Sequence, residues 1–156
     1  MQEGDLIQVA YVVRDLEGAM KFYVETMGIK PWAIYTFAPP VLERSMVRGK
    51  PSNHTYRIAL AQAGPVQLEL IQPLTGRSTY DEFLEKKGEG LHHVKFYYPD
   101  CQKKLEEFKA KGIEVIQSGK FDEDEHYYLD TEKFYGILIE LGNNGSMRQP
   151  ERFFPA

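Results

Sequence analysis

The chain has 156 residues, of which 42% are hydrophobic and 13% aromatic, enough to bury the core of one compact domain or of two small modules. Its formal net charge of −4 and its scattered basic residues exclude the phosphate-tracking surface of a nucleic-acid-binding protein. The single cysteine, Cys101, rules out an internal disulfide, and no segment is long and apolar enough to span a bilayer. These features predict a cytoplasmic protein without a membrane or nucleic-acid partner.

The first unit of the chain, residues 1–72, opens with a strand followed by a helix. Residues 6–13 alternate and are rich in β-branched and aromatic side chains, which predicts a strand. Asp15 is suited to cap a helix that ends at Gly28, and the apolar residues of that helix follow at a 4-3-4 spacing. Those residues are Leu16, Met20, Tyr23 and Met27. Further strands are predicted over residues 31–37, 54–62 and 65–72.

Residues 38–53 interrupt this unit and show no clear period, and they include Pro39, Pro40 and Pro51. A structureless segment of this length inside a compact domain is usually functional or mobile. We therefore predict a loop that forms a flap over the functional site. Three basic residues in it are candidates to contact a phosphate group of a ligand, although a charged surface loop also explains them: Arg44, Arg48 and Lys50.

The second unit, residues 91–142, repeats the order of the first, and its opening motif lies 85 residues further along the chain. A linker over residues 73–90 contains a short predicted helix at 78–87, and residues 143–156 form a tail in which Phe153 and Phe154 are expected to dock. Within the second unit we expect a strand at 91–98, a helix at 100–111 and strands near 113–117, 124–130 and 136–142. Duplicated units usually pack as a pseudo-symmetric pair with a site between them. The predicted fold is α+β, with two β-α-β-β-β modules forming a curved mixed sheet around a shared cavity.

Four strands, two from each module, carry one residue of a metal-ligating type on the face opposite their apolar side chains. Because side chains alternate across a strand, residues two apart share a face, and these four residues all point away from the helices. They are Gln8, Glu69, His93 and Glu140. Each alone would ordinarily be a solvated or core residue, but two buried carboxylates need a positive partner. The oxygen-rich set with one imidazole suits a divalent ion such as Zn, Co, Ni, Mn or Fe.

Other residues are weaker candidates. Core packing explains the large aromatic residues as well as a substrate pocket does, and those that could line such a pocket are Trp32, Tyr35, Phe37, Tyr56 and Tyr97. Nothing in the sequence places His54, His92 or His126 near the cavity, and alternation predicts that His92 faces away from His93. Cys101 lies on the apolar stripe of the second helix and is expected to be a small buried residue.

The paired modules, their strand-Asp-helix openings and the stretch Glu-Gly-Leu-His-His-Val at 89–94 resemble the vicinal oxygen chelate superfamily over residues 6–142. The resemblance is greatest to the methylmalonyl-CoA epimerase and glyoxalase I branches, especially in segments 68–74 and 83–93. It implies a homodimer and a divalent metal that stabilises an enediolate or enolate while keeping open positions for substrate oxygens. The metal ligands implied by the resemblance are the same four residues: Gln8, Glu69, His93 and Glu140.

Two positions depart from the pattern of these branches. The ligand on the first strand is typically histidine, whereas this chain has Gln8, a neutral and weaker oxygen donor. The epimerases also use a glutamate from the third strand of the first module as an acid/base, and our alignment places Arg57 there. A guanidinium at that position could bind a carboxylate or phosphate of the substrate, or it could be a solvated strand residue.

The sequence therefore predicts a small-molecule enzyme: a metal-dependent isomerase, epimerase or lyase acting on a carbonyl or acyl substrate, with acyl-CoA among the candidates. Glu140 or Glu69 would remove the proton, with Glu140 favoured. The enzyme alternatives are a ring-cleaving dioxygenase, whose iron is generally held by two histidines and one glutamate, and a glutathione-dependent lyase. A metal-free protein that binds an aromatic compound or drug is the alternative from another class, which Gln8 favours and the two carboxylates oppose.

Overall fold

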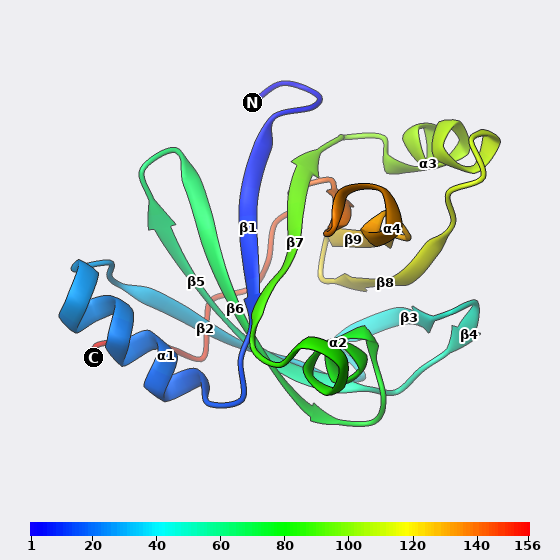
Figure 1. The fold of residues 1–156 in the computed structure, drawn as a ribbon. Coiled ribbons are helices and arrows are strands. Elements are labelled where there is room, and N and C mark those ends of the chain that lie inside the picture. The colour runs from blue at the N-terminus through cyan, green and yellow to red at the C-terminus, as the bar shows by residue number, and fades with distance from the viewer.

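The computed structural model describes all 156 residues and contains one eleven-stranded sheet that curls around the middle of the molecule (Figure 1). The strand order in the sheet is β11-β2-β5-β6-β1-β7-β10-β9-β8-β3-β4. The bounds of the strands are Leu6–Val12 (β1), Trp32–Phe37 (β2), Leu42–Val47 (β3), Lys50–Pro51 (β4), Thr55–Ala63 (β5), Val66–Thr75 (β6), Gly90–Tyr97 (β7), Val115–Phe121 (β8), Asp124–Leu129 (β9), Leu138–Gly142 (β10) and Arg152–Phe154 (β11). The predicted α+β fold with a curved mixed sheet is confirmed.

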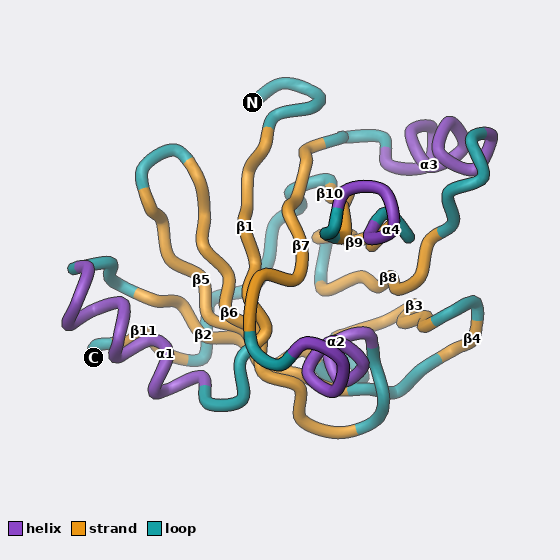
Figure 2. Tube along the Cα trace, in the orientation of Figure 1, coloured by secondary structure: helices purple, strands orange, loops and turns teal.

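The helices lie around the sheet, as Figure 2 shows in purple. Their bounds are Leu16–Phe22 (α1), Thr79–Lys87 (α2), Cys101–Ala110 (α3) and Glu132–Tyr135 (α4), and α1 continues as the π-helical turn Tyr23–Met27. Asp15 caps α1 by accepting from the Gly18 N–H, and Ser78 caps α2 in a reciprocal capping box with Asp81. None of these helices is both long and apolar enough to cross a membrane.

The two halves of the sheet meet at their opening strands. β1 runs parallel to β6 in the first half, and β7 runs parallel to β10 in the second. β1 and β7 pair antiparallel with each other, and they lie side by side in Figure 1. This seam brings the strands of Gln8, Glu69, His93 and Glu140 into four adjacent positions of one sheet.

The two faces of the sheet have different partners. On the outer face, α1 packs Leu16 and Met20 against Trp32, and α3 packs Cys101 against Leu141. The inner face holds the largest core cluster, which the two halves share. Its members include Ala10, Val12, Tyr35, Phe37, Tyr56, Ile58, Leu60, Ile71, Tyr128 and Leu138.

The segment 38–53, predicted to be a structureless loop, is instead the β3–β4 hairpin. β3 pairs antiparallel with β8 of the second half, so it extends the sheet and covers an edge that would otherwise be open. The strand was not visible in the sequence because its register shifts between Glu43 and Met46, and Arg44 has a positive φ of 53°. None of residues 38–53 lines the cavity described below, so the hairpin does not form the predicted flap over it.

The tail after β10 crosses from the second half of the sheet to the far edge of the first. It ends in β11, which pairs with β2, and Phe154 packs beside the α1 cluster. On the way, Arg148 makes a bidentate ion pair with Asp122 and lies over the Phe121 ring. Asn144, Gly145 and Met147 of this segment line the inner cavity. The tail therefore forms part of the wall of the site.

Candidate metal centre

Three side chains from three different strands converge on the inner face of the sheet. Glu69 from β6, His93 from β7 and Glu140 from β10 place one potential ligand atom each within 4.8 Å of one another. His93 Nε2 lies 2.8 Å from Glu140 Oε2 and 3.5 Å from Glu69 Oε2. All three residues are buried, and neither His93 Nε2 nor Glu140 Oε2 has a hydrogen bond of good geometry. The alternation of side chains along the strands predicted this convergence.

The charges in this cluster depend on one another. Burial by itself would lower the pKa of His93, but Glu140 and then Glu69 outweigh it and raise that pKa to about 9. Burial would likewise raise the pKa of Glu140, but Lys95 and His93 outweigh it and lower that pKa to about 2. Without a bound ion, the cluster is thus stabilised by the attraction between the Glu140 carboxylate and the His93 imidazolium. A metal ion bound there could supply the positive charge in place of the imidazolium.

A buried lysine adjoins the triad. Lys95 lies two residues after His93 on β7, so it shares the inner face, and its Nζ lies 3.7 Å from both Glu140 Oε1 and Asp124 Oδ1. The aliphatic part of the Lys95 side chain lies against Gly142, and the Cβ of any other residue at position 142 would overlap the Lys95 Cε. Burial is the main reason that the pKa of Asp124 is raised to about 6. Neither Lys95 nor Asp124 was predicted from the sequence, although the two-residue spacing from His93 was a signal for Lys95.

The cavity beside the triad is small and continues outward. It has a volume of about 70 Å³ and is lined by residues of both halves, including Tyr56, His126 and Tyr128. An outer cavity of about 210 Å³ adjoins it. Four polar residues line both cavities and lie between them: Gln8, Gln67, Lys95 and Asn144. The outer cavity lies at the surface, where the exposed Met1 also lines it.

The other predicted site residues are distributed over both faces of the sheet. Gln8 lines the cavity, and its amide N–H donates to Gln67 Oε1 at 2.7 Å, a bond that does not use the Gln8 amide oxygen. Tyr56 also lines the cavity, and Tyr35 belongs to the inner core cluster. Trp32 is fully buried in the outer cluster under α1, where its indole N–H donates to the Ile29 carbonyl.

Arg57 and Tyr97 are not brought to the cavity. Arg57 alternates with the inward-facing Tyr56 and Ile58, and its Nε donates to the Thr36 hydroxyl at 3.4 Å. Tyr97 lies at the last position of β7, beyond the lining residues. Of the basic residues of the hairpin, Arg48 pairs with Glu82 and Arg44 with Glu125, and neither lines the inner cavity.

Two further histidines, which nothing in the sequence placed near the cavity, belong to the surroundings of the triad. His126 lines the cavity, and burial lowers its pKa to about 4. The prediction that His92 faces away from His93 was wrong, because the Nδ1 atoms of the two rings are 2.9 Å apart. A shift in the β1·β7 register, which alternation does not anticipate, lies at this position.

A family model described as the Glyoxalase/Bleomycin resistance protein/Dioxygenase superfamily matches residues 7–129. The chain belongs to this superfamily. It is 29% identical over 143 residues to the uncharacterized protein YqjC of Bacillus subtilis (strain 168), covering 87% of this chain and 89% of YqjC. It is 28% identical over 143 residues to mitochondrial methylmalonyl-CoA epimerase of Homo sapiens, covering 88% of this chain and 73% of that protein.

Solved structures give the same picture of the fold. A methylmalonyl-CoA epimerase in complex with methylmalonyl-CoA and NH4+ superposes with a TM-score of 0.67 at 21% identity, covering 96% of this chain and all (100%) of that one. A Streptomyces coelicolor methylmalonyl-CoA epimerase variant in complex with 2-nitronate-propionyl-CoA gives a TM-score of 0.66 at 21% identity, covering 96% of this chain and 100% of that one. The resemblance to the vicinal oxygen chelate superfamily, with epimerase-like neighbours, is confirmed.

Proposed function

We propose that this member of the superfamily is a divalent-metal-dependent isomerase, epimerase or lyase that acts on a small acyl substrate through an enolate. The observation that carries the proposal is the buried triad of Glu69, His93 and Glu140, whose ligand atoms all lie within 4.8 Å of one another. Two carboxylates and an imidazole suit a divalent ion of the Zn, Co, Ni, Mn or Fe group. The amide oxygen of Gln8 would be the fourth ligand.

The residues present fit such an ion in charge as well as in type. Three carboxylates, those of Glu69, Asp124 and Glu140, surround a space that contains one buried ammonium, that of Lys95. With His93 neutral, a doubly charged ion would make the sum of these charges zero. The buried His93 Nε2 and Glu140 Oε2, which contact each other without a hydrogen bond of good geometry, would both gain the ion as a ligand partner.

A divalent ion held there would polarise the carbonyl of a substrate and stabilise the negative charge of its enolate. Glu69 is the better candidate for the base, although the sequence favoured Glu140. Both oxygens of Glu140 are engaged, Oε1 with Lys95 and Oε2 with His93, and these contacts lower its pKa. Glu69 has no contact with Lys95 and contacts His93 through Oε2 alone, so its other oxygen is available to face a substrate. Asp124, whose raised pKa of about 6 suits proton transfer near neutrality, is a second acid/base candidate.

The shape of the site supports a substrate with a small head and a long arm. The inner cavity of about 70 Å³ has room for a few atoms beside the triad, whereas the outer cavity of about 210 Å³ leads to the surface. Superfamily neighbours bind methylmalonyl-CoA and a propionyl-CoA analogue. We therefore propose an acyl-CoA thioester as the substrate class. Assembly as a homodimer, which the family resemblance implied, remains a prediction that sedimentation analysis can test.

Exchange of the proton next to the thioester carbonyl tests this function directly. Methylmalonyl-CoA and propionyl-CoA are incubated in D2O with protein supplemented with each of the five metals, and loss of the α-proton signal is followed by NMR. We expect exchange with at least one metal, and a loss of exchange of about 100-fold or more in Glu69→Gln. The matched control is Glu106→Gln on the exposed face of α3, which should exchange like the wild type. Exchange that persists in the presence of chelator would contradict the proposed function, and exchange that persists in Glu69→Gln would contradict the assignment of Glu69 as the base.

A further inference from the structure

His92 occupies an irregular position in β7. Between two adjacent pairs of the β1·β7 ladder, β1 advances by one residue, from Ala10 to Tyr11, whereas β7 advances by two, from His93 to Leu91. His92 is therefore the extra residue of a β-bulge, and a bulge redirects the side chain that it carries. The ring packs against Tyr80 and Phe83 of α2, and the residue is 1% exposed.

The two adjacent histidines are joined by a hydrogen bond between their Nδ1 atoms, at 2.9 Å. Such a bond requires a proton on one Nδ1 and a free electron pair on the other. The opposite nitrogen of His93, Nε2, is the one that faces Glu69 and Glu140. His93 thus directs one nitrogen to the proposed metal position and the other to His92.

We infer that His92 is a positioning residue that orients His93 and fixes its tautomer for metal binding. This inference rests on the proposed metal site. A metal on His93 Nε2 needs the electron pair of that atom, so the proton of the neutral ring must lie on Nδ1. His93 Nδ1–H then donates a hydrogen bond to His92 Nδ1, and the proton of the neutral His92 ring must lie on its own Nε2.

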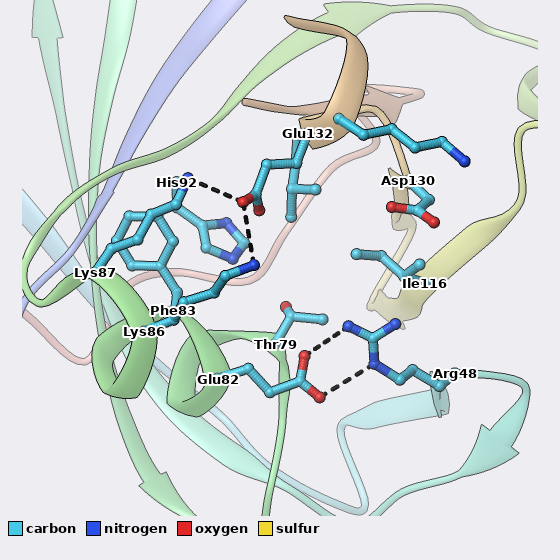
Figure 3. Close-up of a pocket in the computed structure, with 12 residues that line it drawn as sticks. Arg48, Thr79, Glu82, Phe83, Lys86, Lys87, His92, Ile116, Asp130 and Glu132 are labelled. Carbon is cyan, nitrogen blue, oxygen red and sulfur yellow. Dashed lines mark hydrogen bonds and ion pairs between the residues drawn. The ribbon is translucent and has the colours of Figure 1, made fainter. Parts of the chain in front are cut away.

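The surroundings of the second ring nitrogen of His92, Nε2, are consistent with a proton on that atom. His92 Nε2 is buried and makes no hydrogen bond of good geometry, although a contact with the Thr79 backbone favours a proton on the His92 ring. The residue lies in the wall of a second cavity of about 350 Å³, formed by α2, α4, the start of β8 and Arg48 of the hairpin. Figure 3 draws His92 beside Phe83 at this wall. The chain of two rings therefore runs from the triad to a separate cavity, and its last N–H is directed away from the metal.

Charge explains why an imidazole is suited to this role. Ligating histidines most often donate their second N–H to a carboxylate, a backbone carbonyl or water. The surroundings of the triad already contain the carboxylates of Glu69, Asp124 and Glu140. Another buried carboxylate would add an uncompensated charge, whereas a neutral imidazole accepts the hydrogen bond without adding one.

Two variants of His92 separate positioning from packing. His92→Asn places an amide oxygen near the former Nδ1 atom and keeps the acceptor, whereas His92→Leu removes it. We expect His92→Leu to lower the affinity for Zn²⁺ or Co²⁺, measured by competition with a chromophoric chelator, about 10- to 100-fold, and His92→Asn to restore most of it. The matched control is His54→Leu, another histidine that is 1% exposed but has no contact with His93, and its metal affinity should equal that of the wild type.

The tautomers provide a readout that does not need a variant. In ¹⁵N NMR spectra of the metal-bound wild type, we expect His93 to carry its proton on Nδ1 and His92 on Nε2. Equal metal affinity of His92→Leu and the wild type, or a proton on His92 Nδ1, would overturn the inference and leave the proposed metal site intact. A wild-type protein that binds neither ion would overturn the proposed function, and the inference with it.

Discussion

Glu140 is the carboxylate on which the charge balance of the site depends. It is 3% exposed and contacts both buried cationic groups, with His93 at 2.8 Å and Lys95 at 3.7 Å. Replacing it with glutamine leaves Lys95 with Asp124 alone, and removing one partner of a buried ion pair is strongly destabilising. In metal-free protein we expect Glu140→Gln to lower the free energy of unfolding, measured in urea, by about 3 kcal/mol or more.

Glu69→Gln provides the comparison, because Glu69 is less buried and has no contact with Lys95. Its loss of stability should be clearly smaller, and the exposed Glu106→Gln should change little. If the two buried glutamates gave equal losses, Glu140 would not be the group that neutralises Lys95.

At the level of single residues, the sequence predicted the members of the triad but not their surroundings. Glu69, His93 and Glu140 were found because each faces away from its apolar neighbours in a regular strand. Asp124 and His126 were missed because a sequence does not show which face of β9 points inward until the order of the strands is known. His92 was misplaced because a β-bulge breaks the alternation on which the prediction depended.

The elements that could not be predicted are those held by long-range contacts. The strand-helix openings have local signals in Asp15 and Asp100, which cap α1 and α3. The β3–β4 hairpin and β11 have no comparable signal, since each is stabilised by pairing with a strand that is distant in the sequence, β8 and β2 respectively. The strands that could not be predicted from the sequence therefore lie at or next to the edges of the sheet.

The tail that closes the inner cavity is an element whose role can be tested. Gly145 lies so close to the backbone of Glu123 that the Cβ of any other residue would overlap it. Gly145→Ala should displace the tail from the cavity that Asn144 and Met147 also line. We expect a chelator to remove bound metal several-fold faster from this variant, as measured by stopped-flow absorbance with Co²⁺. Gln149→Ala, an exposed residue of the same segment, is the control, and unchanged release from Gly145→Ala would exclude a closing role for the tail.

For the molecule as a whole, buried histidines set the response to acid. Burial lowers the pKa values of His54, His92 and His126, the last to about 4. In the unfolded chain these groups titrate near 6.5, so between pH 6.5 and 4 the unfolded state binds more protons than the folded state. The contribution of these three histidines to stability is therefore fully present above about pH 6.5 and falls as the pH is lowered toward 4, by up to about 3 kcal/mol for His126 alone.

Urea unfolding of metal-free wild type and His126→Phe at several pH values checks this expectation. The variant should lose less stability than the wild type between pH 6.5 and 4. Asp124 acts in the opposite direction, because its raised pKa of about 6 favours the folded state at low pH, so the difference between the two proteins is the informative quantity. Parallel pH profiles would show that His126 does not stay neutral in the folded protein.

In the proposed metal centre, Glu69 of the first half and Glu140 of the second bind the same divalent ion. Elemental analysis of protein purified without chelator tests this most directly, together with the shift in Tm on adding Zn, Co, Ni, Mn or Fe. We expect about one divalent ion per chain, lost when His93→Ala is combined with Glu140→Gln. A wild-type protein without a stoichiometric ion, whose Tm none of the five metals raises, would contradict the metal centre and favour a metal-free binding protein.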